Sequence, residues 1–169
     1  YLRETWRVLK PGGFMRCQIN GLPAAAARYD TWSGVRISAA ELEAFCVEND
    51  FQMLSLEGTQ TQYMWTTLRK RERGWYETAR KPEAPVVIRR ITNAQNSEPV
   101  APARGRFAAL SLWVENLPEE CDLVNFEVHV GGARGPLTYI GPKEYDGMAQ
   151  VNLRLPVEVG TGLQAVELK

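Results

Sequence analysis

The sequence predicts two parts of different fold class: an α/β part in residues 1–70 and an all-β sandwich in residues 86–169. Helical and extended signals alternate in the first part. The second part contains only short apolar stretches separated by turn residues. The residues between them, 71–85, are polar and contain two prolines, which is typical of a linker between domains.

The α/β part is expected to begin with a helix and a strand. Leu2, Trp6 and Leu9 recur at the spacing of one helical face. Residues 10–13, Lys-Pro-Gly-Gly, end this helix, because proline lacks a backbone donor and glycine tolerates positive φ. The mostly apolar residues 14–20 then suit a buried strand of a parallel sheet.

A second helix and two strands are expected to complete this part. Ser38 and Glu41 have the spacing of a capping box, in which each side chain satisfies a backbone N–H group of the other residue. Asn49 can end the helix, since asparagine tolerates the left-handed conformation. Residues 51–56 and 63–68 are predicted as strands joined by a polar turn.

The linker carries two features of its own. The basic cluster in residues 69–73, Arg-Lys-Arg-Glu-Arg, is interpreted as a solvated strand end that runs into the linker. Trp75 and Tyr76 are the aromatic exceptions in this polar stretch, and we expect them to pack the linker against one of the two domains.

The all-β part shows strands and turns without a helical period. Apolar residues alternate with polar ones in residues 126–130, which places Phe126, Val128 and Val130 on one face and His129 on the other, with Glu127. The predicted strands are residues 86–88, 107–114, 126–130, 137–140, 149–155 and 163–168.

One motif at the start of the chain resembles a known family. Residues 4–13, Glu-Thr-Trp-Arg-Val-Leu-Lys-Pro-Gly-Gly, resemble the pattern that precedes the fifth strand of class I S-adenosylmethionine-dependent methyltransferases. The resemblance covers residues 1–70, and it implies the C-terminal part of a Rossmann-like methyltransferase sheet. It also implies that the strand in residues 63–68 runs antiparallel between the strands in 14–20 and 51–56.

The resemblance does not extend to the cofactor site. That family holds S-adenosylmethionine with a glycine-rich loop after the first strand and an acidic residue at the end of the second, and no segment here matches either. Gly12 and Gly13 follow a helix rather than a strand. The chain begins without a methionine, in what reads as the middle of a helix. We therefore expect a fragment that binds S-adenosylmethionine only as part of a complete protein and is inactive alone.

The second part resembles a different family. It is similar to an Ig-like (IPT/TIG-like) C-terminal domain that is common in acidobacterial proteins, and the similarity covers residues 91–168 within the predicted domain 86–169. This resemblance implies an Ig-like β-sandwich and no catalytic residue. The matching segments are residues 93–94, 100–102, 128–132, 139–142 and 150–152.

Three residues of the α/β part are candidates for the substrate side. Gln18 and Asn20 lie at the C-terminal end of a predicted strand, where open α/β sheets place ligands. Each could bind a substrate or anchor a loop. Trp32 lies in the following long segment and could belong to a substrate lid or cover the core. His129, the only histidine, lies in the sandwich and is not expected to be catalytic. The catalytic residues are not identified.

Composition excludes several classes of partner and site. Twenty basic residues balance twenty acidic ones, whereas a nucleic-acid-binding domain usually has a basic excess. No apolar run reaches the roughly 18 residues of a membrane span. Cys17, Cys46 and Cys121 are too few and too far apart for a disulfide framework, and with one histidine they predict no zinc site. Reduced, cytoplasmic surroundings fit best.

Two functions remain open from the sequence. The first is a methyltransferase whose cofactor-binding half lies upstream and whose methyl acceptor is unknown. Methyl transfer depends largely on positioning, so it leaves little acid–base signature. The second is a non-catalytic binding or interaction protein that acts through the Ig-like sandwich, by contact with a partner protein or by self-association.

Overall fold

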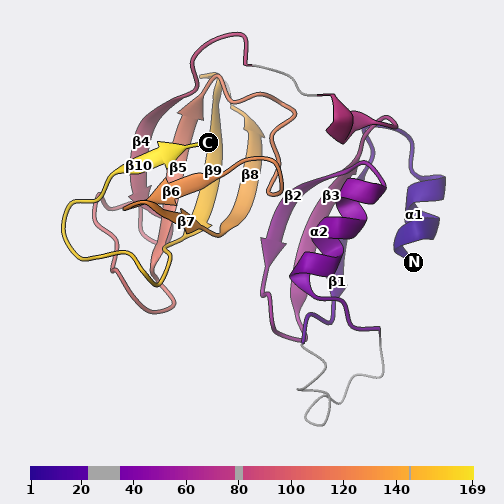
Figure 1. The fold of residues 1–169 in the computed structure, drawn as a ribbon, viewed down its shortest axis with the longest axis horizontal. Helices are drawn as coiled ribbons and strands as arrows, with labels where there is room; N and C mark the ends of the chain where they lie inside the picture. Colours follow the sequence, from indigo (N-terminus) through magenta and orange to yellow (C-terminus); the bar gives the residue numbers. More distant parts are fainter. Residues whose placement is uncertain (23–34, 79–81, 145) are drawn as a thin grey trace. The chain divides into compact units, whose positions relative to one another are not determined.

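The computed structural model describes residues 1–22, 35–78, 82–144 and 146–169 (Figure 1). The chain divides into two compact units, Tyr1–Ala79 and Arg80–Lys169. The division falls within the stretch 71–85. The fold is mostly β-sheet, with antiparallel pairing in every ladder between the strands of one unit.

Unit 1 contains two α-helices and three strands, followed by a short 3-10 helix. They are α1 (Leu2–Val8), β1 (Phe14–Ile19), α2 (Ala39–Glu48), β2 (Phe51–Glu57), β3 (Met64–Lys70) and η2 (Trp75–Glu77). The strand order is β1-β3-β2, and β3 is antiparallel to both neighbours. The predicted position and direction of the last strand are therefore confirmed.

The boundaries of α2 follow local chemistry. The predicted capping box is present: Ser38 Oγ accepts from the Glu41 N–H at 3.2 Å, and Glu41 Oε2 accepts from the Ser38 N–H at 2.7 Å. Asn49 ends the helix, but its φ is −120°, and its side chain donates to the Phe45 carbonyl at 2.9 Å. The left-handed residue is Asp50, with φ 51°. The prediction was wrong about which residue makes the turn.

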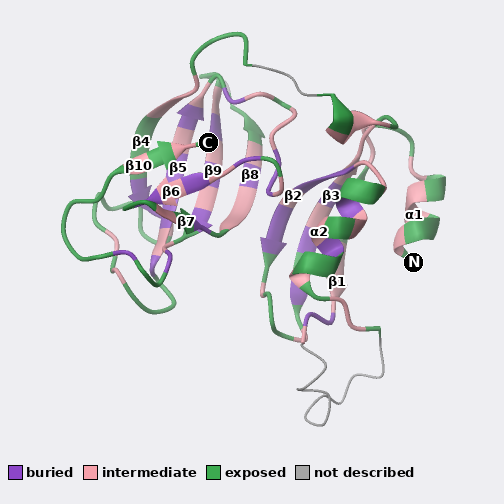
Figure 2. Ribbon diagram, viewed as in Figure 1, coloured by how far each residue is buried: buried purple, intermediate pink, exposed green. Residues whose placement is uncertain are grey.

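The core of unit 1 lies on the face of the sheet that α2 covers. Figure 2 shows buried residues along β2 and β3. The fully buried apolar side chains are Leu42, Cys46, Phe51, Met53, Met64 and Leu68. Strand β1 is not the buried strand that its composition predicts, because Phe14 and Arg16 are exposed. It ends the sheet, and its only ladder in the described residues is the antiparallel one with β3.

Residues 71–78 are held against unit 1. The carboxylate of Asp50 accepts hydrogen bonds from the N–H groups of Gly74 and Trp75, each at 2.9 Å. The Tyr76 hydroxyl donates to the Phe51 carbonyl at 3.0 Å. The expectation that Trp75 and Tyr76 pack against one unit is confirmed, and the first half of the predicted linker belongs to that unit.

Unit 2 contains two antiparallel sheets. The strands are β4 (Val87–Asn93), β5 (Ala109–Glu115), β6 (Val128–Val130), β7 (Ala133–Gly135), β8 (Leu137–Lys143), β9 (Met148–Arg154) and β10 (Val166–Leu168). Within unit 2 the orders are β8-β9-β5-β4 and β10-β6-β7. The three-stranded sheet crosses in front of the four-stranded one (Figure 1). This arrangement agrees with the predicted β-sandwich, although β7 was not predicted.

The inner faces of these two sheets form the second core. Alternate residues of β5 and β9 are buried, and Val128 and Val130 are buried on the other sheet. The side chain of His129, between them, points to the opposite face and contacts Glu127, as the alternation predicts. Strand β4 lies at the sheet edge, and a bulge shifts its register between Ile88 and Arg90.

Candidate functional site

The candidate site is the C-terminal end of β1, where the sequence places Gln18 and Asn20. The structure brings both residues to this end, beside the turn that joins β2 and β3. Trp32 lies outside the described residues. The hydrogen bonds of Gln18 and Asn20 therefore show whether these side chains hold neighbouring loops or are available to a substrate.

Asn20 is almost completely buried, with 2% of its surface exposed. Its Oδ1 atom accepts from the Leu22 N–H at 3.1 Å, and its backbone carbonyl accepts from the Ile37 N–H at 3.0 Å. It also forms an isolated parallel bridge with Arg36. These bonds join β1 to the two chain segments that follow it on either side of residues 23–34. They are the contacts of a loop anchor, one of the two roles that the sequence allows for Asn20.

Gln18 is half-buried and reaches the β2–β3 turn. Its Nε2 atom lies 3.4 Å from the Gln62 carbonyl oxygen. Next to it, the Gly21 N–H donates to the Thr61 carbonyl at 2.9 Å. A Cβ atom on Gly21 would lie 2.9 Å from the Cβ and Sδ atoms of Met64. Glycine is thus required where the chain leaves β1 so close to this turn. A substrate contact by Gln18 stays a prediction.

The basic cluster in residues 69–73 lies at the end of β3, and Glu72 and Arg73 are exposed, as the sequence predicts, but its cations also make contacts that the sequence does not predict. Each of its four cations lies over an aromatic ring: Arg69 over Phe14, Lys70 and Arg73 over Trp6, and Arg71 over Trp75, at 4.2–5.4 Å from the ring centroids. Cation–π contacts of this kind hold a cation against a partly apolar surface. Trp75 is close to Arg71 in the sequence, but Trp6 and Phe14, which contact the other three cations, are more than 50 residues away.

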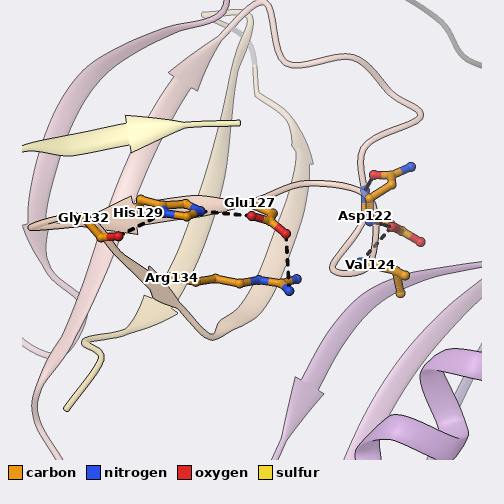
Figure 3. A network of polar contacts seen from close by, with 7 residues as sticks. Asp122, Val124, Glu127, His129, Gly132 and Arg134 are labelled. Carbon is orange, nitrogen blue, oxygen red and sulfur yellow. Dashed lines mark hydrogen bonds and ion pairs between the residues drawn. The ribbon is translucent and has the colours of Figure 1, made fainter. Parts of the chain in front are cut away.

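His129 lies in a polar network on the outer face of the three-stranded sheet (Figure 3). Its Nε2 is 2.9 Å from Glu127 Oε2, and its Nδ1 is 3.4 Å from the Gly132 carbonyl oxygen. Glu127 also pairs with Arg134 at 3.3 Å. The hydrogen bond from His129, followed by the charge of Arg134, lowers the pKa of Glu127. Both ring nitrogens thus have polar neighbours within this network. The ion pair between Arg134 and Glu127 was not predicted, because nothing in the sequence around Arg134 indicates its partner.

Two of the three described thiols, those of Cys17 and Cys121, are poor nucleophiles. Burial raises the pKa of Cys17. For Cys121, burial and the nearby carboxylates of Asp122 and Glu120 raise the pKa to about 11. Both thiols are therefore protonated at neutral pH, and the thiolate is the reactive form. Among the described residues, no group of three His, Cys, Asp or Glu side chains is placed to hold a metal ion.

No described helix has the length and apolar character needed to cross a membrane. Comparison with protein-family models, with curated proteins and with solved structures finds no match to this chain.

Proposed function

We propose that unit 1 is the C-terminal end of a class I methyltransferase sheet and that the complete enzyme transfers a methyl group from S-adenosylmethionine. One observation carries the proposal: β3 runs antiparallel between β1 and β2, after a helix that connects those two strands. A reversed last strand inserted between its two predecessors is the feature that separates this family from other doubly wound folds.

The turn between α1 and β1 gives independent support. Gly12 has φ 80°, and the Gly13 N–H donates to the Lys10 carbonyl at 2.9 Å, so the glycines close the turn after the helix. The Gly12 N–H donates to the Lys70 carbonyl at 2.8 Å, and the Lys70 N–H donates to the Gly13 carbonyl at 2.9 Å. The segment that resembles the family motif thus joins α1, β1 and the end of β3.

The proposal assigns this chain to the substrate side. S-adenosylmethionine supplies an electrophilic methyl group that a nucleophile displaces in line from the sulfonium sulfur. In this proposal Asn20 holds the segments that flank residues 23–34, and Gln18 supports the β2–β3 turn. Trp32 remains a candidate for the lid. The methyl acceptor is not assigned.

Calorimetry with S-adenosylmethionine tests the proposal. The chain of residues 1–169 is expected to give no heat of binding at millimolar cofactor, because the proposal places the cofactor contacts on strands outside this segment. Micromolar binding by this chain would contradict the placement. The coding sequence upstream of Tyr1 provides a second test. The proposal predicts a strand and a G-x-G-type loop roughly 80–110 residues before Tyr1. A start codon close to Tyr1 would overturn it.

An interaction function for unit 2 is the alternative. It is supported by the buried apolar core of unit 2, whose side chains come from strands of that unit. In this alternative the Ig-like sandwich binds a partner protein or a second copy, and unit 1 is a scaffold. Sedimentation of residues 82–169 at increasing concentration tests self-association. A cytoplasmic location is part of both proposals.

A further inference from the structure

One face of the β1–β3 pair carries exposed aromatic rings and arginines. Phe14 is 59% exposed and Trp65 is 40% exposed. The pairing register puts Phe14 beside Arg69, Arg16 beside Thr67, and Gln18 beside Trp65. Because side chains alternate along a strand, these six residues share one face. We call them the β1–β3 patch.

The two arginines of the patch lie over its two rings. The guanidinium carbon of Arg16 is 5.6 Å from the centroid of Trp65, and that of Arg69 is 5.4 Å from the centroid of Phe14. The Nε atom of Arg69 is buried, and no described atom accepts a hydrogen bond from it. The patch therefore combines apolar area with two cations, one of which has an unsatisfied donor.

The opposite face of the same sheet shows how such a surface is covered in this protein. There α2 packs on β2, and its residues Leu42 and Cys46 are completely buried. Side chains of two strands form a strip about 10 Å wide, since neighbouring strands lie about 4.8 Å apart. That width equals the diameter of an α-helix, about 10 Å. The geometry of the patch thus suits a helix laid along it.

The charges of the patch indicate which side chains a helix bound to it would carry. Arg16 and Arg69 lie within the patch, and among the described pairs of β2 with β3 the one acidic residue is Glu57, at the Trp65 end. A second copy of the patch would bring arginines against arginines, which repel. A nucleic acid would have to displace the guanidinium groups from the rings, and the chain has no net charge to attract it. Carboxylates that flank an apolar stripe complement the patch instead.

We propose that the β1–β3 patch binds an amphipathic helix with an apolar stripe and acidic flanks, supplied by a partner. Apolar side chains of the helix cover Phe14 and Trp65. Its carboxylates pair with Arg16 and Arg69. The two rings are about 14 Å apart along the diagonal of the ladder, which a helix spans in about nine residues. This proposal does not depend on the methyltransferase assignment.

Two synthetic peptides test it against the whole chain of residues 1–169. Both are helical, about 16 residues long, with the same leucine stripe, and one has glutamate flanks where the other has lysine. Fluorescence anisotropy at low salt is expected to give a dissociation constant of about 10 μM or tighter for the acidic peptide, and binding at least about tenfold weaker for the basic one. Equal binding of the two peptides would overturn the proposal.

Three variants assign the binding to the patch. Trp65→Ser is expected to weaken the acidic peptide about tenfold or more. Val157→Ser is the control, since Val157 is 75% exposed in unit 2 and its replacement should leave binding unchanged.

Arg16→Glu changes an exposed residue, so it tests charge without disturbing the core. It should reverse the preference between the two peptides, in favour of the lysine peptide. An unchanged preference in Arg16→Glu would contradict the proposal even if Trp65→Ser failed to fold. Tighter binding of an oligothymidylate than of the acidic peptide would also overturn it, in favour of nucleic acid.

Discussion

The Nζ atom of Lys70 lies 2.6 Å from the backbone carbonyl oxygen of Trp6. The same ammonium group donates to the Leu9 carbonyl at 2.7 Å and lies 4.2 Å from the centroid of the Trp6 ring. The last carbonyl groups of a helix have no partner within it, and a cation there also favours the helix dipole. One side chain at the end of β3 thus holds the C-terminal end of α1.

Replacing Lys70 by methionine should therefore destabilise the protein. Hydrogen bonds from a charged group contribute about 1.5–3 kcal/mol, so we expect Lys70→Met to lower the free energy of unfolding by about 2 kcal/mol. Lys10→Met is the matched control, because Lys10 is exposed in the turn after α1, and its effect should stay below about 0.5 kcal/mol. Urea denaturation followed by circular dichroism measures both. Equal losses would show that Lys70 does not anchor α1.

Asp50 offers a test that separates its carboxylate from its backbone conformation. Asp50→Gly removes the acceptor for the Gly74 and Trp75 N–H groups but keeps the positive φ free of strain. We expect a loss of about 1–2 kcal/mol from the two lost bonds. Asp50→Ala should cost about 1 kcal/mol more, because a Cβ atom disfavours the left-handed conformation. Urea denaturation of the pair decides this. If the alanine variant is as stable as the glycine variant, the φ of Asp50 carries no energetic cost.

Limited trypsin digestion should report where the two units are joined. Residues 71–78 are bound to unit 1, whereas residues 82–85 are exposed and lie outside any strand. We therefore expect the first cut after Arg80, rather than after Arg71 or Arg73, and a resistant C-terminal fragment, because unit 2 has its own core. Mass spectrometry identifies the fragments. Early loss of unit 2 with survival of unit 1 would contradict the two-unit organisation.

The Glu127 network predicts a dependence of stability on pH. Its pKa is lowered below the ordinary value of 4.5, mainly by the hydrogen bond from His129. A carboxylate with a lowered pKa stabilises the folded state above that ordinary value, and the contribution is lost as pH falls through the folded pKa. Glu127→Gln should therefore lower the melting temperature at pH 7, and the difference from the wild type should shrink below pH 4.5. Thermal melts between pH 7 and pH 3 provide the check. A difference that stays constant over this range would exclude Glu127 as its source.

Features set by neighbouring residues could be predicted from the sequence. The capping box needs only Ser38 and Glu41 three positions apart, and both of its hydrogen bonds are present. The alternation in residues 126–130 likewise places His129 beside Glu127. The order β1-β3-β2 was also predicted, but from a family resemblance rather than from the residues themselves.

Features set by distant residues could not be predicted. The apolar composition of β1 does not say which face a helix covers, so Phe14 was expected inside and lies outside. The cluster in 69–73 looks solvated until Trp6 and Phe14 come within range of its cations. Asn49 and Asp50 both tolerate positive φ, and the sequence does not distinguish them. At the candidate site, Gln18 and Asn20 lie at the end of β1, as the sequence predicts, but the turn that Gln18 contacts was not predicted.

The bulge in β4 has a consequence for how this protein behaves at high concentration. A flat edge strand with free backbone groups invites the edge of another molecule, and this pairing is a common route to aggregation. Here the ladder slips between Ile88 and Arg90, and the extra residue, Arg89, reaches across to Glu115 as an ion pair. A bulge and a pair of adjacent arginines both make intermolecular strand addition unfavourable. We expect deletion of Arg89 to remove both the bulge and one charge, and so to leave a flatter edge to which the edge strand of another molecule can add more readily.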